Sequence, residues 1–243
     1  MSEGEGDRTG KAGIREMSLE VLRTARVAVL GGEEGTTPSS TWFVLHGYRQ
    51  LARRFARRFT GVAEARRRIV APEALSRFYL APGDRPHGQA DPVGASWMTR
   101  EDREAEIADY VRYLDRLARS LPGSAGAPPS GHRTVLGFSQ GAHTAARWAV
   151  LGSVRCHRLV LWGAGLPGDL PEGGRERLAA LELILVRGED DDLRQADEEA
   201  REEALLAEWG IRWRELRHPG GHRIDGEVLQ RLVAEEEAVR TPR

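Results

Sequence analysis

RTVLGFSQGAHTAARWAV (residues 133–150) is the stretch of sequence that decides the fold class. A short apolar run, RTVLGF, ends in Gly-Phe-Ser-Gln-Gly, and a segment of small residues with helical spacing follows at once. One interpretation is an ordinary turn in which Ser139 caps a helix. The other is a sharp, strained bend that pushes the Ser139 hydroxyl into a site, and glycine on both sides of the serine favours it.

The rest of the chain alternates short apolar runs with amphipathic segments. Strands are predicted over residues 23–32, 40–47, 66–75, 133–138, 157–165, 181–188 and 211–218. Helices are predicted over residues 49–62, 99–121, 141–152, 172–181, 194–210 and 225–240. Residues 81–94, rich in Gly, Pro and Asp, are expected to form an irregular surface loop. Continuous apolar strands alternating with helices predict an α/β fold, a mostly parallel central sheet with helices on both faces.

The 243 residues are enough for one large domain with a buried core. We expect a flexible polar leader over residues 1–17 and a single domain over residues 18–239, without a large cap domain. The formal net charge of −1 gives no general attraction to nucleic acid. No apolar run approaches the roughly 18 residues that a membrane span needs. The single cysteine and the polar first ten residues favour a cytoplasmic protein.

Three chemically distinct side chains follow three of the predicted strands. Ser139 follows the first, the acidic loop GEDDD (188–192) the second, and HPGGH (218–222) the third. Ligands of an open α/β sheet bind beyond the carboxyl ends of its strands, so these groups are expected to converge. Serine needs an adjacent base, and His222 is the best candidate; His218, its nearest rival, lies at the strand end before a proline. By spacing alone, any aspartate of the acidic loop could orient His222: Asp190, Asp191 or Asp192.

The oxyanion of an acyl-transfer reaction needs two amide donors. We expect one to be the N–H of Gln140, the residue after the nucleophile. The other is expected from the loop after an early strand, FVLHGYRQ, where Gly47 lets the chain turn and Tyr48 offers its N–H. His46 in this loop is interpreted as a bracing residue.

Six segments together resemble a known family of hydrolases. LHGY, APEALSRFYL, GASWMTREDREAEIADYVRYL, GFSQGA, GEDDD and GGH are similar to the predicted-esterase branch of the carboxylesterase/phospholipase family, which includes acyl-protein thioesterases. The resemblance runs from residue 41 to about residue 232 and implies an α/β-hydrolase fold. The family's acid lies in a G-x-x-D pattern, which implies Asp191 here, although the Val-Pro that usually follows is absent. Trp97 resembles a tryptophan near the family's site.

The resemblance and the strand-end residues predict a carboxylesterase-type serine hydrolase that works through an acyl-enzyme. A thioesterase or lysophospholipase with the same triad, or a catalytically silent binding module, are the alternatives. Tyr79, Trp97 and Met98 are candidates for the substrate pocket; for Trp97, pinning its loop to the core is an equal alternative. No cofactor or metal is expected, because the seven histidines form no metal-binding pair. The expected partner is a small-molecule ester, and a homodimer is the assembly considered.

Overall fold

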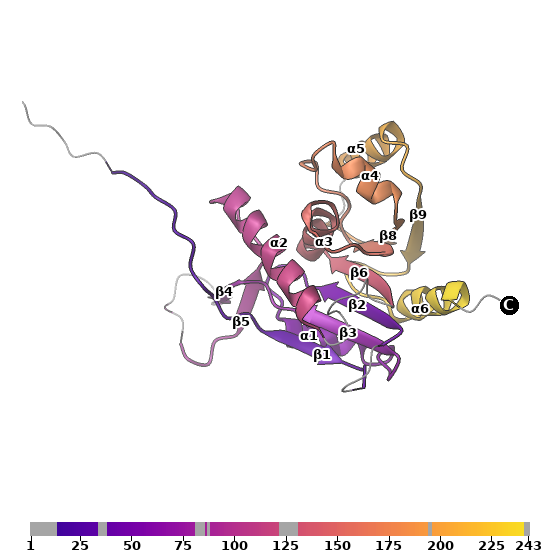
Figure 1. Ribbon diagram of the computed structural model, residues 1–243, viewed down its shortest axis with the longest axis horizontal. Coiled ribbons are helices and arrows are strands. Elements are labelled where there is room, and N and C mark those ends of the chain that lie inside the picture. Colours follow the sequence, from indigo (N-terminus) through magenta and orange to yellow (C-terminus); the bar gives the residue numbers. More distant parts are fainter. Residues whose placement is uncertain are drawn as a thin grey trace, which may run out of the picture.

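The computed structural model describes residues 14–33, 38–80, 86, 88–121, 131–193 and 196–240. Its centre is a seven-stranded sheet in the order β1-β3-β2-β6-β7-β8-β9 (Figure 1). The strands are β1 (Val27–Leu30), β2 (Ser40–Leu45), β3 (Arg67–Pro72), β6 (His132–Phe138), β7 (Arg158–Trp162), β8 (Glu182–Gly188) and β9 (Trp213–His218). Every neighbouring pair is parallel except β1 with β3. The prediction of a mostly parallel central sheet is therefore confirmed.

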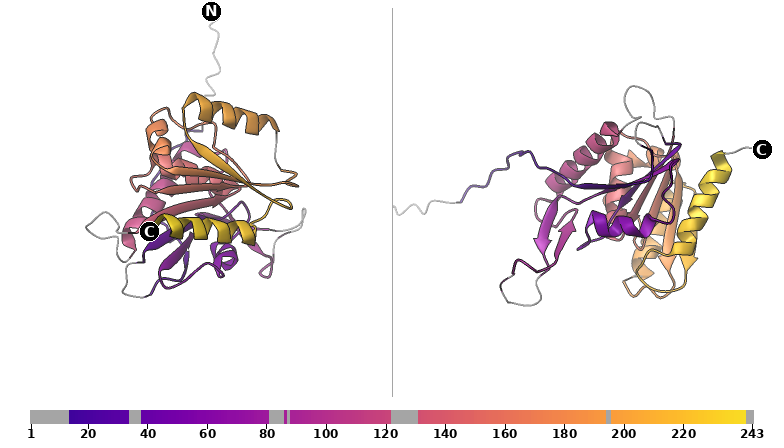
Figure 2. Two further views of the ribbon diagram at one scale, coloured as in Figure 1. Left: turned by 90° about the vertical axis from the view of Figure 1, so that its right-hand side faces the viewer. Right: turned by 90° about the horizontal axis from the view of Figure 1, so that it is seen from below.

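Helices cover both faces of the sheet, as predicted (Figures 1 and 2). On one face lie α1 (Ala52–Ala56), its 3₁₀ extension (Arg57–Phe59) and α6 (Gly226–Arg240). On the other lie α2 (Arg103–Ser120), α3 (Gln140–Leu151), α4 (Gly174–Ala179) and α5 (Ala196–Glu208). Successive residues of a strand point to opposite faces, so Trp42 packs on the α6 side and Phe43 on the α3 side.

A two-stranded hairpin pairs β4 (Ser76–Tyr79) with β5 (Val93–Ser96). The predicted loop over residues 81–94 is therefore wrong at its end, because residues 93–94 belong to β5. Ala95 anchors β5 to the loop after β2: its carbonyl accepts the Arg49 N–H at 2.9 Å, and its N–H donates to Gln50 O at 3.1 Å. A Cβ at Gly94 would lie 2.6 Å from Arg49 O, so this contact requires glycine. Residues 81–85 and 87 of the predicted loop lie outside the described residues.

Residues 14–26 form neither helix nor strand and extend away from the sheet in Figure 1. They contact α2 through the Glu20–Arg112 ion pair at 2.6 Å. Residues 1–13 of the predicted leader lie outside the described residues. Among the helices of the described ranges, none has the length and apolar character that crossing a membrane requires.

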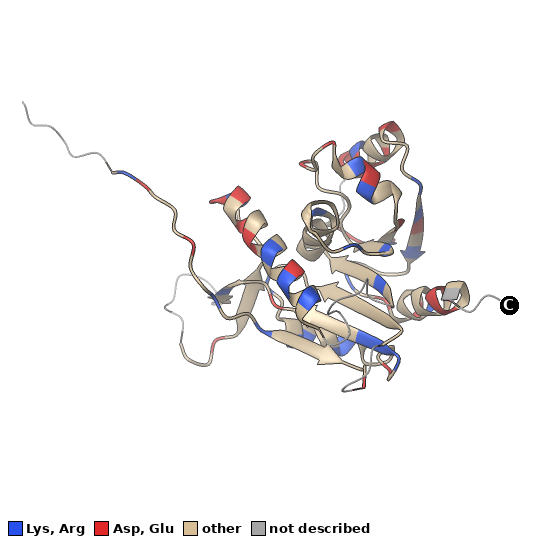
Figure 3. Cartoon of the chain, in the orientation of Figure 1, with Lys and Arg blue, Asp and Glu red and all other residues tan. Residues whose placement is uncertain are grey.

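The helix α2 is held to α3 by one buried carboxylate. In Figure 3 acidic residues lie near the start of α2 and basic residues toward its end, which complements the helix dipole. Asp115 faces inward and accepts Trp148 Nε1 at 2.9 Å, and Ser153 N and Oγ at 2.8 and 2.6 Å. Burial raises the pKa of Asp115, but the hydrogen bonds from Ser153 and Trp148 outweigh it and leave the pKa below its usual value.

Replacing Asp115 by alanine is expected to lower the free energy of unfolding by about 2–4 kcal/mol, because the Trp148 and Ser153 donors lose their acceptor. Urea unfolding at pH 7 measures the change. Asp109→Ala is the matched control on the same helix, since Asp109 is exposed and pairs only with Arg112 among the described residues. Its cost should stay within about 1 kcal/mol. Equal losses in the two variants would contradict the assigned role of Asp115.

Candidate active site

Ser139 sits in a strained turn between β6 and α3. Its backbone has φ 55° and ψ −123°, outside the regions that residues other than glycine favour. The turn is anchored by the Ser139 N–H, which donates to Trp162 O of the neighbouring strand at 2.8 Å. A Cβ at Gly137 would overlap the Gly141 carbonyl, and one at Gly141 would lie 2.6 Å from His46 O. The glycines around Ser139 are therefore required by close packing of α3 against β2 and β6.

Asp191, just after β8, meets His222, just after β9. Asp191 Oδ2 lies 2.7 Å from His222 Nδ1, and Asp191 Oδ1 accepts the Leu193 N–H at 3.1 Å. The Asp191 residue is 7% exposed, whereas Asp190 and Asp192 are exposed to solvent. Of the three aspartates that spacing left open, the fold brings Asp191 to the imidazole.

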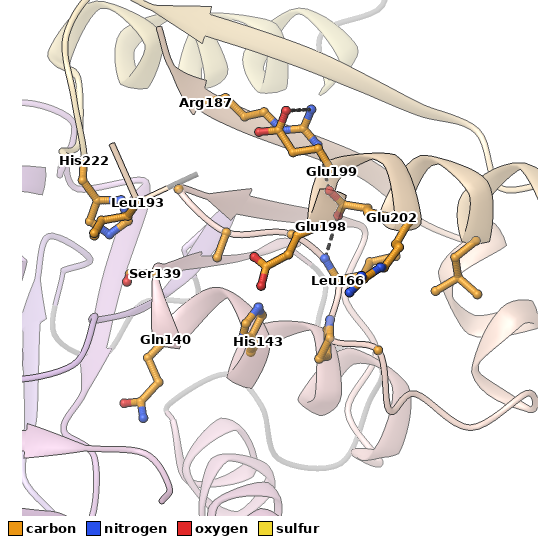
Figure 4. Close-up of a pocket in the computed structure, with 17 residues that line it drawn as sticks. Ser139, Gln140, His143, Leu166, Arg187, Leu193, Glu198, Glu199, Glu202 and His222 are labelled. Carbon is orange, nitrogen blue, oxygen red and sulfur yellow. Dashed lines mark hydrogen bonds and ion pairs between the residues drawn. The ribbon is translucent and has the colours of Figure 1, made fainter. Parts of the chain in front are cut away.

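His222 lines the same cavity as Ser139. Its ring packs on Phe138, the residue before Ser139, with ring centroids 4.7 Å apart. His222 Nε2 is buried and has no hydrogen-bond partner among the described residues. Figure 4 places Ser139 and His222 together at one end of a cavity that both line. An imidazole whose Nδ1 is bound by a carboxylate and whose Nε2 is unoccupied can accept a proton from a nearby hydroxyl.

Tyr48 and Gln140, the residues predicted to supply the oxyanion donors, follow Gly47 and Ser139 in the chain. The loop after β2 passes close to the serine, since a Cβ on Gly47 would lie 3.2 Å from Ser139 Cβ. Within the described residues, neither the Tyr48 N–H nor the Gln140 N–H donates a hydrogen bond. The Gln140 side chain is engaged elsewhere: its Oε1 accepts the Trp97 N–H at 3.0 Å. Both N–H groups predicted as oxyanion donors are thus without an acceptor among the described residues, and their role as donors stays a prediction.

His46 and Trp97 brace the loop after β2. His46 is fully buried and its Nε2 accepts the Ala74 N–H at 3.1 Å, as its interpretation as a bracing residue requires. Burial lowers the pKa of His46, and its contact with the Gly47 carbonyl opposes this. Trp97 is 3% exposed and donates Nε1–H to His46 O at 2.8 Å. His218 lies against Trp162, whose Nε1 is 3.3 Å from its Nε2.

The residues predicted for a substrate pocket do not line the cavity at Ser139. Trp97 pins the loop after β2, which is the alternative that the sequence left open. Met98 contacts Arg147 through its sulfur at 3.4 Å. Tyr79 is 45% exposed on the β4–β5 hairpin. Their role in binding a substrate stays a prediction.

The cavity instead opens toward α5 and has a volume of about 550 Å³. Its walls are the start of α3 with His143, residues 163–168 after β7, the end of β8 with Arg187, the helix α5, and His222. Apart from Ser139, Gln140 and His222, the residues that line the cavity were not predicted from the sequence. Two features could have indicated them: His143 follows Ser139 by four residues on one helix, and residue 163 lies at the end of a strand next to β6.

A buried ion pair fixes the far wall of this cavity. Glu202 of α5 accepts Arg187 Nη2 at 2.7 Å and the Leu166 N–H at 2.6 Å. Arg187 also pairs with Glu215 of β9 at 2.7 Å. Burial raises the pKa of Glu202, while the Leu166 amide and Arg187 oppose this. The contacts tie α5 and the segment after β7 to the sheet. Across the described ranges, no group of three or more His, Cys, Asp or Glu residues is placed to hold a metal ion.

Comparison with known proteins gives structural similarity without sequence similarity. No protein-family model matches the chain, and no curated protein matches it significantly. The structure is similar to acyl-protein thioesterase 2 of Zea mays, with a TM-score of 0.63 and 17% identity, covering 88% of this chain and 99% of that one. The structure of esterase PE8 gives a TM-score of 0.61 at 20% identity, covering 88% of this chain and 99% of that one. A phospholipase/carboxylesterase of Dyadobacter fermentans gives a TM-score of 0.61 at 15% identity, covering 90% of this chain and 99% of that one.

These similarities extend over almost the full length of the compared chains, and they agree with the strand order and the helices on both faces. At identities of 20% or less they establish the fold alone. The protein therefore has the α/β-hydrolase fold.

Proposed function

We propose that the protein is a serine hydrolase that cleaves carboxylic esters through an acyl-enzyme. The single observation that carries the proposal is the Asp191–His222 pair at 2.7 Å, in a cavity that the strained Ser139 also lines, with the buried Nε2 of His222 unpartnered among the described residues. The fold shared with esterases and a thioesterase supports the same class of reaction. In this proposal Ser139 is the nucleophile, His222 the base and Asp191 the orienting acid.

The reaction begins when Ser139 Oγ attacks the carbonyl carbon of the ester and His222 Nε2 takes the hydroxyl proton. The carbonyl oxygen becomes an oxyanion, which the N–H groups of Tyr48 and Gln140 receive. His222 then gives its proton to the leaving alcohol as the C–O bond breaks. Water attacks the resulting acyl-serine through the same steps, so that a carboxylic acid and free enzyme are released.

Asp191 acts on His222 throughout this cycle. Its carboxylate holds the proton on Nδ1, so that Nε2 carries the lone pair that accepts the serine proton. It also stabilises the imidazolium that forms. Because Asp191 is almost fully buried, this electrostatic contribution is screened little by solvent.

The same machinery would cleave thioesters or lysophospholipids. The triad does not determine which leaving group is preferred. Activity on a panel of aryl esters, acyl thioesters and lysophospholipids would identify it. A chain that binds such a ligand without cleaving it is the remaining alternative, and the first experiment separates it from an enzyme.

Labelling with a fluorophosphonate tests whether Ser139 is an activated nucleophile. We expect one covalent adduct per chain, mapped by mass spectrometry to Ser139 and lost in Ser139→Ala. Ser120→Ala is the control, because Ser120 lies at the far end of α2 and donates to Leu117 O; its labelling should equal that of the wild type. If the folded protein gives no adduct at pH 7–8, the proposal of a hydrolase is overturned and the catalytically silent binding module is favoured.

A further inference from the structure

His143 is a polar residue of the cavity that the proposed mechanism does not use. It lies on α3 four residues after Ser139 and lines the cavity together with Ser139 and His222. Figure 4 shows its imidazole directed into the cavity, with the carboxylate of Glu198 on the opposite side. Among the described residues, neither ring nitrogen of His143 takes part in a hydrogen bond.

His143 is uncharged at neutral pH. Burial lowers its pKa to about 4, and the nearby positive charge of Arg147 acts in the same direction, against Asp169. A neutral imidazole has one N–H donor and one acceptor nitrogen. The side chain therefore presents a hydrogen-bonding group, not a charge, to whatever fills the cavity.

The remaining polar groups of the cavity differ in how far they are engaged. Arg187 and Glu202 bind each other and belong to the far wall. Glu198 of α5, across from His143, forms no ion pair or hydrogen bond with a described residue. Between these groups lie apolar side chains, among them Leu166 and Leu193. The cavity of Ser139 thus presents an imidazole without a partner among the described residues, with the carboxylate of Glu198 across from it.

An alkyl chain that filled this cavity would displace water and leave the imidazole without a partner. An unpaired buried polar group costs free energy, whereas one that gains a partner does not. A substrate with an oxygen at this position would give the imidazole N–H an acceptor. The cavity is therefore expected to favour a substrate oxygen over a CH₂ group of equal size at this position.

We propose that His143 binds an oxygen of the substrate, so that the enzyme prefers esters with an ether, hydroxyl or carbonyl oxygen near the scissile bond over alkyl esters of the same size. The inference rests on the proposed function, because it concerns the cavity of Ser139. Four residues of helix rise about 6 Å, which places this oxygen roughly two to four bonds from the scissile carbonyl carbon. The oxygen can lie on the acyl side or on the alcohol side.

Two pairs of isosteric esters test the preference and distinguish the two sides. On the acyl side, 4-nitrophenyl 3-methoxypropanoate is compared with 4-nitrophenyl pentanoate. On the alcohol side, 2-methoxyethyl acetate is compared with butyl acetate. In each pair one CH₂ is replaced by oxygen. Dividing the kcat/KM ratio of the wild type by that of a variant removes the intrinsic reactivity of the esters.

His143→Phe keeps a ring at the position and removes both hydrogen-bonding atoms. For one of the two pairs, the preference for the ether over the alkyl ester should fall roughly three- to tenfold relative to the wild type, the range for one neutral hydrogen bond. The loss should appear mainly in KM, because the contact is remote from the reacting atoms. His143→Gln, which restores a donor, should recover part of the preference.

His157→Phe is the control, since His157 is exposed and does not line the cavity. Its Nδ1 accepts the Arg133 N–H instead. It should leave both ratios unchanged. Equal ratios in the wild type and His143→Phe for both pairs would overturn the inference while ester cleavage stands. Absence of cleavage of all four esters by a wild type that also fails to react with fluorophosphonate would instead overturn the proposed function.

Should His143→Phe fail to fold, the wild type decides. The imidazole ¹⁵N resonances of His143 are expected to shift when a trifluoromethyl ketone with a methoxyethyl group binds Ser139, but not with the butyl ketone of equal size. Identical shifts with the two ketones would overturn the inference.

Discussion

Asp191→Asn is expected to lower kcat by about 10⁴-fold while the protein stays folded. Asparagine has nearly the same shape as aspartate, so the packing around residue 191 is kept. Its NH₂ group, however, can face His222 Nδ1 only if that nitrogen carries no proton. The imidazole proton then lies on Nε2, the atom that has to accept the proton of Ser139. Hydrolysis of an aryl acetate, followed at 405 nm, and urea unfolding measure the two effects.

The two neighbouring aspartates provide matched controls for this variant. Asp190→Asn and Asp192→Asn remove the same charge from the same loop, but both residues are exposed to solvent. We expect kcat to stay within about twofold of the wild type in each, as for ordinary surface substitutions. A large loss in Asp192→Asn, or a loss of less than about tenfold in Asp191→Asn, would assign the orienting role to another residue.

The strands and most helices of this protein are predictable from its apolar pattern alone. Runs such as LELILVRG can be buried on both faces of a sheet, and helical spacing follows each of them. The β4–β5 hairpin is not predictable in this way. Its β5 strand has four residues, and its position depends on Gly94 fitting against Arg49, which is a tertiary contact. No local pattern contains that information.

The functional groups at the strand ends are predictable because the topology of a parallel sheet brings them together. Ser139, Asp191 and His222 each follow a strand, and the strand order β6-β7-β8-β9 places them at one edge. The choice among three consecutive aspartates is different. Only the course of the loop after β8 decides that Asp191 is buried against His222 while its neighbours face solvent.

The cavity could not be predicted from the composition of its lining. The segment that becomes α5 is rich in acidic residues, yet its residue Glu202 is buried and binds Arg187. Trp97 shows the converse, since an aromatic residue near the site serves to hold the His46 carbonyl. Whether such a residue faces the cavity or the core depends on how two elements pack. A single sequence does not encode that choice as a pattern.

The glycine after β7 leads to the second large expected effect. Gly163 has φ +67°, and a Cβ there would lie 2.8 Å from His222 Cε1 and 3.0 Å from Nδ1. Gly163→Ala therefore requires the imidazole to move, and the ring cannot shift without disturbing its 2.7 Å contact with Asp191. Since a displacement of about 1 Å in a catalytic group costs about 10²-fold, we expect kcat to fall by that factor.

A second glycine separates this local effect from backbone strain. Gly210 has φ +60°, and a Cβ there would have its nearest contact at 3.7 Å, with the end of the Arg175 side chain. Gly210→Ala and Gly163→Ala should both lose about 1–2 kcal/mol of unfolding free energy, the cost of a left-handed conformation for alanine. Only Gly163→Ala should slow both ester hydrolysis and the reaction with fluorophosphonate, because only there does the new methyl group meet His222. Full activity in Gly163→Ala would mean that the position of this imidazole does not limit the reaction, and the proposed role of His222 as the base would then fail.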